Sequence, residues 1–314
     1  MRLGLSLAVL SAATFGTSGV FARSLLDGGW SAGSAVTARV AVAAVVLAVP
    51  ALFAMRGRWR VARRSLPTIA LYGAYAVAGT QVAYFYAVQH LPVSVALLLE
   101  YSGILLVVLW MWARHGQVPR RLTVAGAVVA LAGLVLVLDL AGGGRVDPVG
   151  VLWGLIAAVG LATYFVLSAR VDPELPSIAL ASGGMAIGAV VLVVAGAAGV
   201  LPVAATFGDV PFAGRAVSWL VPVIGLSVVA AVIAYLAGIG AARLLGASLS
   251  SFVGLTEVMF AVLFAWLWLG ELPSWVQAAG GASIITGIVL VKVGMDWTSR
   301  NATTLPELAS AGRK

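Results

Sequence analysis

Long apolar runs, each close to the length needed to cross a lipid bilayer, follow one another through most of the chain. A helix rises about 1.5 Å per residue, so roughly 20 apolar residues cover the ~30 Å hydrocarbon core. Segments that meet this test lie at residues 3–22, 34–55, 67–88, 93–113, 122–140, 149–168, 177–199, 217–240, 247–269 and 274–293. They are apolar all round and lack the charged face of a surface helix. The pattern therefore predicts ten transmembrane helices.

The composition supports this fold class. Of 314 residues, 62% are hydrophobic and only 10% are charged, and the mean hydropathy is +1.08. A soluble domain of this length would need more charge at its surface, so lipid must surround most of the helices. We expect an all-α integral membrane protein.

The Lys and Arg residues between the apolar runs predict the orientation. With the N-terminus in the cytoplasm, 15 of the 19 lie on the cytoplasmic side, Arg23, Arg145 and Arg215 lie outside, and Arg39 lies within a span. Because positive residues favour the cytoplasmic side, we expect a multi-pass plasma-membrane protein with both termini cytoplasmic. The net charge of +8 then reflects topology, with added attraction of Arg56–Arg64 to anionic lipid, and indicates no nucleic-acid partner.

Matching residues recur in the same order in the two halves of the chain. The matches are Ala13-Thr14-Phe15 with Ala162-Thr163-Tyr164, Ser94 and Glu100 with Ser251 and Glu257, and Gly126 and Gly133 with Gly280 and Gly287. A five-span unit crosses the membrane an odd number of times, so its tandem copy must be inverted. We expect inverted five-helix repeats at residues 1–143 and 144–294, followed by a flexible cytoplasmic tail at 295–314. In transporters, such repeats form a site near the midplane that opens to each side in turn.

The stretch LSSFVGLTEVMFAVLFAWLWLGE, from Leu249 to Glu271, resembles the signature helix of the drug/metabolite transporter superfamily, EamA-like family. Its first-half counterpart, Val93–Trp112, is a weaker match. The resemblance covers Met1 to about Gly294, and it implies ten helices in an inverted five-plus-five arrangement and metabolite transport, often export. The family commonly has Glu-Pro where this chain has Glu100-Tyr101 and Glu257-Val258. The resemblance therefore implies no mechanism based on a proline kink at those points of this chain.

Glu100 and Glu257 are the main candidate functional residues. An ionisable group inside a membrane costs at least about 2.5 kcal/mol and commonly serves a function. We expect the two glutamates to occupy equivalent places in the repeats and to face a central cavity. There they would bind a substrate cation or exchange a proton. The alternative is a structural pair that accepts hydrogen bonds from neighbouring helices and locks their packing.

Arg39 and four polar residues complete the candidate set. Arg39 would either extend to the outer headgroups or pair with a glutamate or a substrate carboxylate. Gln81 and Tyr84 are three residues apart and share a helix face. Tyr164 and Tyr235 would add hydroxyl groups to the cavity or anchor helix ends at the interface.

The sequence offers little for other chemistry. There are no cysteines, only two histidines, no G-x-S-x-G elbow and no G-x-x-x-x-G-K-[ST] loop, so we expect no enzyme, cofactor or metal site. The function that the sequence favours is secondary transport of a small metabolite such as an amino acid, driven by an ion gradient such as protons, by exchange or by the solute's own gradient. Two alternatives stay open: a non-transporting membrane receptor or scaffold, and a lipid or polyprenyl-phosphate translocase.

Overall fold

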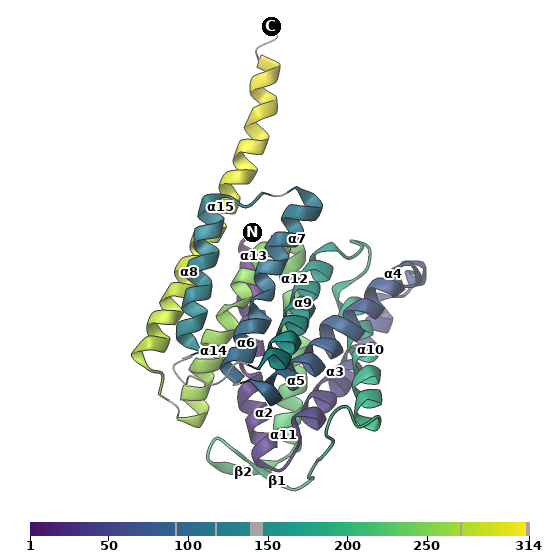
Figure 1. The fold of residues 1–314 in the computed structure, drawn as a ribbon. Coiled ribbons are helices and arrows are strands. Elements are labelled where there is room, and N and C mark those ends of the chain that lie inside the picture. The colour runs from purple at the N-terminus through teal and green to yellow at the C-terminus, as the bar shows by residue number, and fades with distance from the viewer. Residues whose placement is uncertain (92, 117, 139–146, 271, 312–314) are drawn as a thin grey trace.

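Helices form nearly all of the structure, as the apolar runs predict (Figure 1). The computed structural model describes residues 1–314 apart from 92, 117, 139–146, 271 and 312–314, and it describes no side chains at 94, 115 and 296–311. The first half contains α1 (Arg2–Gly16), α2 (Ser18–Asp27), α3 (Ala32–Ala54), α4 (Trp59–Leu71), the π-helical segment η1 (Tyr72–Gly79), α5 (Thr80–His90), α6 (Val93–Tyr101), α7 (Gly103–His115) and α8 (Arg121–Val137).

The second half follows a similar order and adds a small hairpin. Its elements are α9 (Pro148–Arg170), α10 (Ser177–Ala197), β1 (Asp209–Phe212), β2 (Arg215–Ser218), α11 (Leu220–Ile224), the π-helical segment η2 (Gly225–Ile233), α12 (Ala234–Leu245), α13 (Ala247–Gly254), α14 (Thr256–Phe264), the π-helical segment η3 (Ala265–Leu269) and α15 (Trp275–Ala311). The strands pair antiparallel with Val210 opposite Val217. Their turn has positive φ at Ala213 and Gly214, which is typical of a tight two-residue hairpin.

Eight helical segments in the described part of the chain are long and apolar enough to cross a membrane. They coincide with eight of the ten predicted spans. The other two predicted spans, 67–88 and 122–140, fall on η1 with its flanking helices and on α8. Helix α8 has 17 residues, which is short for a span, and the η1 region carries more tyrosine and glutamine. The structure thus establishes an all-helical membrane fold with eight candidate spans.

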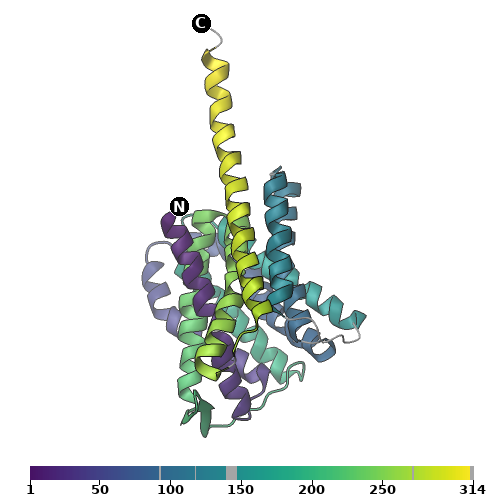
Figure 2. The ribbon, with the colours of Figure 1, turned by 90° about the vertical axis from the view of Figure 1, so that its left-hand side faces the viewer.

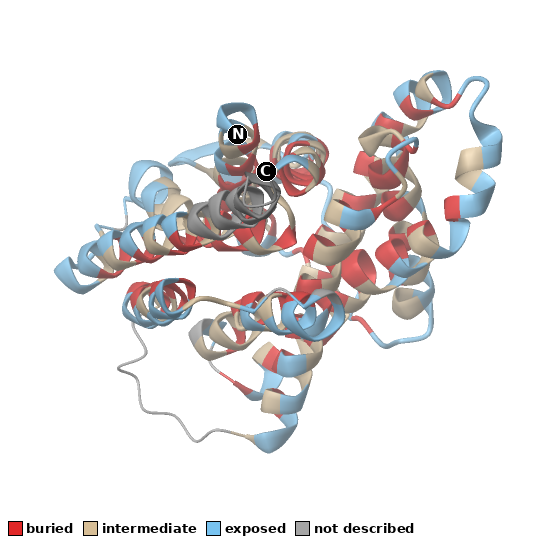
Figure 3. Cartoon of the chain, turned by 90° about the horizontal axis from the view of Figure 1, so that it is seen from above, coloured by how far each residue is buried: buried red, intermediate tan, exposed pale blue. Residues whose placement is uncertain are grey.

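The outer faces of the bundle are apolar. Large side chains such as Val45, Leu52 and Val190 are 73%, 55% and 63% exposed, and buried residues gather where helices face one another (Figure 3). A water-soluble protein rarely exposes so much contiguous apolar surface. Lipid is therefore the expected neighbour of these faces.

The two ends of the bundle are distinct. The N-terminus, the α3–α4 turn and the C-terminal end of α7 lie toward one end, here called the terminal end, and the β1–β2 hairpin lies at the other, the hairpin end (Figure 1). Helix α15 runs beyond the terminal end as far as Ala311 (Figure 2). The tail expected from residue 295 therefore begins as a continuation of α15, and its flexibility stays a prediction.

Two glycines that end helices provide an alignment of the two halves of the chain. Helix α7 ends at Gly116 and η3 ends at Gly270, with φ of 65° and 72°, a left-handed conformation that favours glycine. When these caps are aligned, Gly126 corresponds to Gly280, as predicted. However, Glu100 then corresponds to Gly254 and not to Glu257. The predicted equivalence of the two glutamates requires a different alignment of the halves, and it stays a prediction.

Helices α8 and α15 pack against each other through their glycines. A Cβ on Gly126 would lie 2.7 Å from the carbonyl oxygen of Gly287, and one on Gly133 would lie 2.6 Å from that of Gly280. The helices run antiparallel, since the earlier glycine of α8 meets the later glycine of α15. Small residues of this kind allow close helix contact in membranes.

Candidate functional site

A cavity in two connected parts lies between the halves of the chain. The inner part has a volume of about 120 Å³ and reaches Ala8 and Ala241 toward the terminal end. The outer part, about 590 Å³, extends past the start of α3 and the end of η3 toward the hairpin end. Seven residues line both parts: Phe15, Ser18, Arg39, Gln81, Glu100, Tyr101 and Glu257.

The structure brings all seven candidate residues to this cavity. Arg39, Gln81, Glu100 and Glu257 lie where the two parts join, Tyr84 lines the outer part, and Tyr164 and Tyr235 line the inner part. Their functional roles stay predictions, but their gathering in one place does not depend on any assumed function.

Arg39, on α3, points into the bundle instead of toward headgroups. Its guanidinium donates a hydrogen bond to the carbonyl of Ala230 in η2 and lies 5.6 Å from the centre of the Phe15 ring. No carboxylate of the described residues lies within ion-pair distance of it. A guanidinium carries five N–H donors, so Arg39 retains donors for an anionic group in the cavity.

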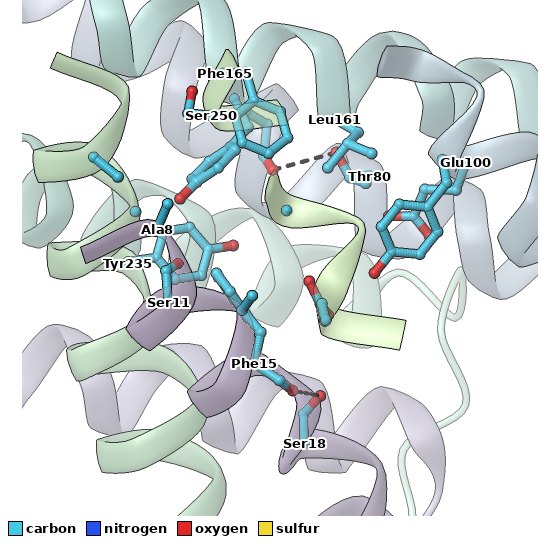
Figure 4. Close-up of a pocket in the computed structure, with 18 of the residues that line it drawn as sticks. Ala8, Ser11, Phe15, Ser18, Thr80, Glu100, Leu161, Phe165, Tyr235 and Ser250 are labelled. Carbon is cyan, nitrogen blue, oxygen red and sulfur yellow. Dashed lines mark hydrogen bonds between the residues drawn. The ribbon is translucent and has the colours of Figure 1, made fainter. Parts of the chain in front are cut away.

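The two glutamates differ in their surroundings. Glu257, on α14, is attracted by Arg39 and lies beside Tyr101. Glu100, on α6, lies close enough to Glu257 for mutual repulsion, and no hydrogen bond within the described part of the chain reaches its carboxylate. Glu257 thus has neighbours of the kind that the structural alternative requires. Glu100, half-buried at the cavity surface (Figure 4), has acceptor sites free for a cation.

Aromatic rings form one wall of the inner part of the cavity. The Tyr235 ring contacts the rings of Phe15 and Tyr164 edge-on, with distances between ring centres of 5.1 Å and 5.5 Å. Tyr164 in turn contacts Phe165 at 4.9 Å. This wall offers apolar and polarisable surface beside the charged groups (Figure 4).

Other lining residues were not predicted, among them Ser11, Phe15, Thr80, Tyr101 and Ser250. Most are small or aromatic residues in apolar runs, where sequence alone cannot distinguish lipid-facing from cavity-facing positions. The sequence does mark Tyr101, because this residue stands where the related transporter family commonly has a proline after the glutamate. Within the described residues, no group of three His, Asp or Glu could hold a metal ion.

The aromatic wall depends on the glycine at position 238. A Cβ there would lie 2.0 Å from the Tyr164 hydroxyl oxygen, so Gly238→Ala should displace the Tyr164 ring. We expect a several-fold loss of ligand affinity with little loss of folded protein, measured by ligand-induced thermal stabilisation. Adding Tyr164→Phe removes the clashing oxygen and should restore part of the affinity, because Ser11 Oγ, 2.8 Å from that Cβ, still crowds the site. Equal affinities in all three proteins would contradict this role.

An ion-pair network joins the two halves at the terminal end. Arg64 of α4 pairs with Asp172 and Glu174 in the α9–α10 loop. The backbone N–H of Glu174, and then Arg64, hold the pKa of Asp172 below its usual range. A carboxyl group whose pKa is lowered contributes stability at higher pH and loses it only as pH falls through that lowered pKa. The link should therefore persist at neutral pH.

Removing this link should open the terminal end. Since the chain has no cysteine, an Ala241→Cys variant reports access to the inner cavity. Adding Asp172→Asn should raise the rate of labelling by a membrane-impermeant thiol reagent from the terminal end a few-fold. Asp209→Asn, on the exposed hairpin, is the matched control and should change nothing. Unchanged labelling in the Asp172 variant would show that the ion pair does not hold the halves together.

Comparison with known proteins adds three findings. The chain matches the model of the EamA-like transporter family twice, at residues 2–139 and 148–293. It is 30% identical over 307 residues to the "Probable terminal-alkyne amino-acid exporter" of Streptantibioticus cattleyicolor, covering 94% of this chain and 95% of the relative. A protein of known crystal structure has the same fold, with a TM-score of 0.76, 21% identity, and coverage of 93% of this chain and 98% of that one.

Proposed function

Because the chain belongs to the EamA-like transporter family, we propose that it is a secondary transporter that exports a small zwitterionic metabolite such as an amino acid by alternating access. The observation that carries the proposal is one guanidinium and two carboxylates beside an aromatic wall in a cavity between the halves. The relative's name, which specifies an amino-acid exporter, supports both the substrate class and the direction.

The charge pattern suits a zwitterion. Arg39 binds the substrate carboxylate with its remaining N–H donors, since bidentate pairs of this type are strong and specific. Glu100, which has free acceptors, binds the ammonium group. The aromatic wall then accommodates a small apolar side chain.

The second carboxylate supplies a site for a coupling proton. In the empty cavity, Glu257 is attracted by Arg39. Glu257 also lies near Glu100, so its charged form attracts the substrate ammonium group that Glu100 binds. Protonation of Glu257 therefore weakens substrate binding, and bound substrate favours loss of the proton, which is the exchange that proton-driven export requires.

The packing of the halves supports ten helices in two inverted repeats. In the register of the glycine caps, Gly126 corresponds to Gly280 and Gly133 to Gly287. The observed contacts cross over, Gly126 to Gly287 and Gly133 to Gly280, which is the pattern of a two-fold axis perpendicular to antiparallel helices. Likewise, α1 packs on α12 and α14 while α9 packs on the corresponding helices α5 and α7.

Orientation follows from the arginine distribution. The protein lies in the plasma membrane with both termini in the cytoplasm. The terminal end is then cytoplasmic and the hairpin end is external. The described cavity then opens outward, with the Arg64–Asp172 pair joining the halves on the inner side. The inverted arrangement provides a second packing, open inward, of comparable energy.

Counterflow in proteoliposomes tests the function. Vesicles loaded with an unlabelled amino acid that has a small apolar side chain should accumulate the labelled compound above protein-free vesicles. The corresponding amine and the corresponding carboxylic acid should each compete poorly. If no zwitterionic compound in such a screen exchanges above background while the protein is folded, a non-transporting receptor or scaffold becomes the better account.

Glu257→Gln tests the proton link separately. The variant should keep counterflow, which needs no net proton movement, but lose the stimulation of net transport by a pH gradient. Asp209→Asn, which makes the same carboxylate-to-amide change outside the cavity, is the control and should respond to the gradient like the wild type. A Glu257 variant that still responds fully to the gradient would remove this residue from coupling.

A further inference from the structure

A cluster of arginines surrounds the α3–α4 turn at the terminal end. Five arginines occur within nine residues: Arg56, Arg58, Arg60, Arg63 and Arg64. Among the ion pairs of the described residues, only Arg64 of these five takes part. Arg56 lies over the Phe53 ring, 4.2 Å from its centre. The cluster therefore holds more positive charge than the protein itself neutralises.

Part of this cluster lines a hollow. A space of about 700 Å³ is bordered by Arg58, Arg60 and Arg64, together with Gly57, Val61 and Glu174. Three arginines and a single acidic residue thus border one space. Guanidinium groups recognise phosphate oxygens through paired hydrogen bonds, so the hollow has the charge and the donors for a phosphate group.

The neighbouring face of α4 is apolar and exposed. Trp59, Arg63 and Leu66 are four and three residues apart and share one face of the helix. Trp59 is 53% exposed and Leu66 is 56% exposed. Tryptophan favours the membrane–water boundary, and an arginine between apolar residues extends its charge to headgroup level. This face therefore suits acyl chains while the adjacent hollow suits a headgroup.

We infer that the α3–α4 turn is a binding site for an anionic phospholipid, with its phosphate between Arg58 and Arg60 and its acyl chains along Trp59 and Leu66. The basic segment lies directly beside a spanning helix, where positive side chains are attracted to an anionic membrane surface. This site is separate from the central cavity and does not depend on what the protein transports.

Lipid retention measured by native mass spectrometry tests the inference. Delipidated full-length protein is titrated with phosphatidylglycerol, with phosphatidylcholine and with inorganic phosphate. Wild-type protein should retain phosphatidylglycerol in preference to phosphatidylcholine and should not retain inorganic phosphate. Arg58→Gln/Arg60→Gln should lower phosphatidylglycerol retention about ten-fold, as expected when two phosphate contacts are lost, and leave phosphatidylcholine unchanged.

A matched control separates a site from general surface charge. Arg114→Gln/Arg121→Gln removes two exposed arginines from the same end of the bundle and should retain phosphatidylglycerol like the wild type. An equal loss in both double variants would show charge attraction without a site and would overturn the inference. Equal retention of phosphatidylcholine, or retention of inorganic phosphate alone, would overturn it as well. Size-exclusion profiles identify any variant that is misfolded. If the Arg58→Gln/Arg60→Gln variant is misfolded, the single change Arg60→Gln takes its place. The single change is also expected to lower phosphatidylglycerol retention.

Discussion

Glu100→Gln is expected to reduce amino-acid counterflow by about ten- to hundred-fold. The amide keeps the size of the side chain but removes the charge that we assign to the substrate ammonium group. A hydrogen bond that involves a charged group contributes about 1.5–3 kcal/mol, and each 1.4 kcal/mol corresponds to a factor of about ten. No hydrogen bond of the described residues would be lost with the carboxylate, so folding should be unaffected.

The control for this variant is Asp209→Asn, which removes a carboxylate from the exposed β1 strand. It should exchange substrate at the wild-type rate. Selectivity provides the more specific test, because Glu100→Gln should also lose the preference for the amino acid over its analogue without an amino group. A variant that folds, transports at full rate and keeps this preference would exclude Glu100 from substrate binding.

Gly280→Ala is expected to cause a large loss of stability for so conservative a substitution. A Cβ at this position would lie 2.6 Å from the carbonyl oxygen of Gly133 and 2.7 Å from the backbone nitrogen of Val137. Backbone atoms cannot move aside as a flexible side chain can, so α8 and α15 must separate. Overpacking of this kind costs about 1–3 kcal/mol, and a clash with backbone belongs in the upper part of that range, above the helix-propensity gain of about 1 kcal/mol from replacing glycine.

The adjacent residue supplies a matched control on the same helix. A Cβ on Gly281 would meet only the flexible end of Met259, at 3.3 Å, so Gly281→Ala should leave the thermal unfolding temperature in detergent unchanged or raise it slightly. Gly280→Ala should lower it. Equal temperatures for the two variants would mean that the glycine contact between α8 and α15 is not a tight one.

Much of the fold follows from the sequence because a helix that spans a lipid bilayer must be both long and apolar. Eight of the ten predicted spans coincide with candidate membrane spans of the described residues, and the family match confirms the resemblance that Leu249–Glu271 indicates. The β1–β2 hairpin was not predicted, because Pro211 within β1 argues against a strand from sequence alone. The interruptions of helices at Ser102 and Leu255 were also missed, since apolar runs show no sign of them.

The cavity residues likewise divide into those that the sequence predicts and those that only the structure reveals. Charged and polar residues inside apolar runs, such as Arg39 and Glu100, were predicted because burial in a membrane is costly for them. Phe15 has no such cost, and the Ser11 hydroxyl is satisfied by the carbonyl of Ala234, so only the packing of α1 reveals that they face the cavity. The serine–glutamate spacing and the helix-ending glycines Gly116 and Gly270 align the repeats differently, because a serine and a glutamate carry less positional information than two helix ends.

Alternating access can be measured as the exposure of cavity residues to each side of the membrane. In this cysteine-free chain, Ala261→Cys lies in the outer part of the cavity and Ala241→Cys in the inner part. Alternating access predicts that impermeant thiol reagents reach Ala261→Cys from the hairpin end and Ala241→Cys from the terminal end, and that a transported amino acid changes the two labelling rates in opposite directions. Labelling of both from the same side, or rates that rise and fall together with substrate, would contradict the account.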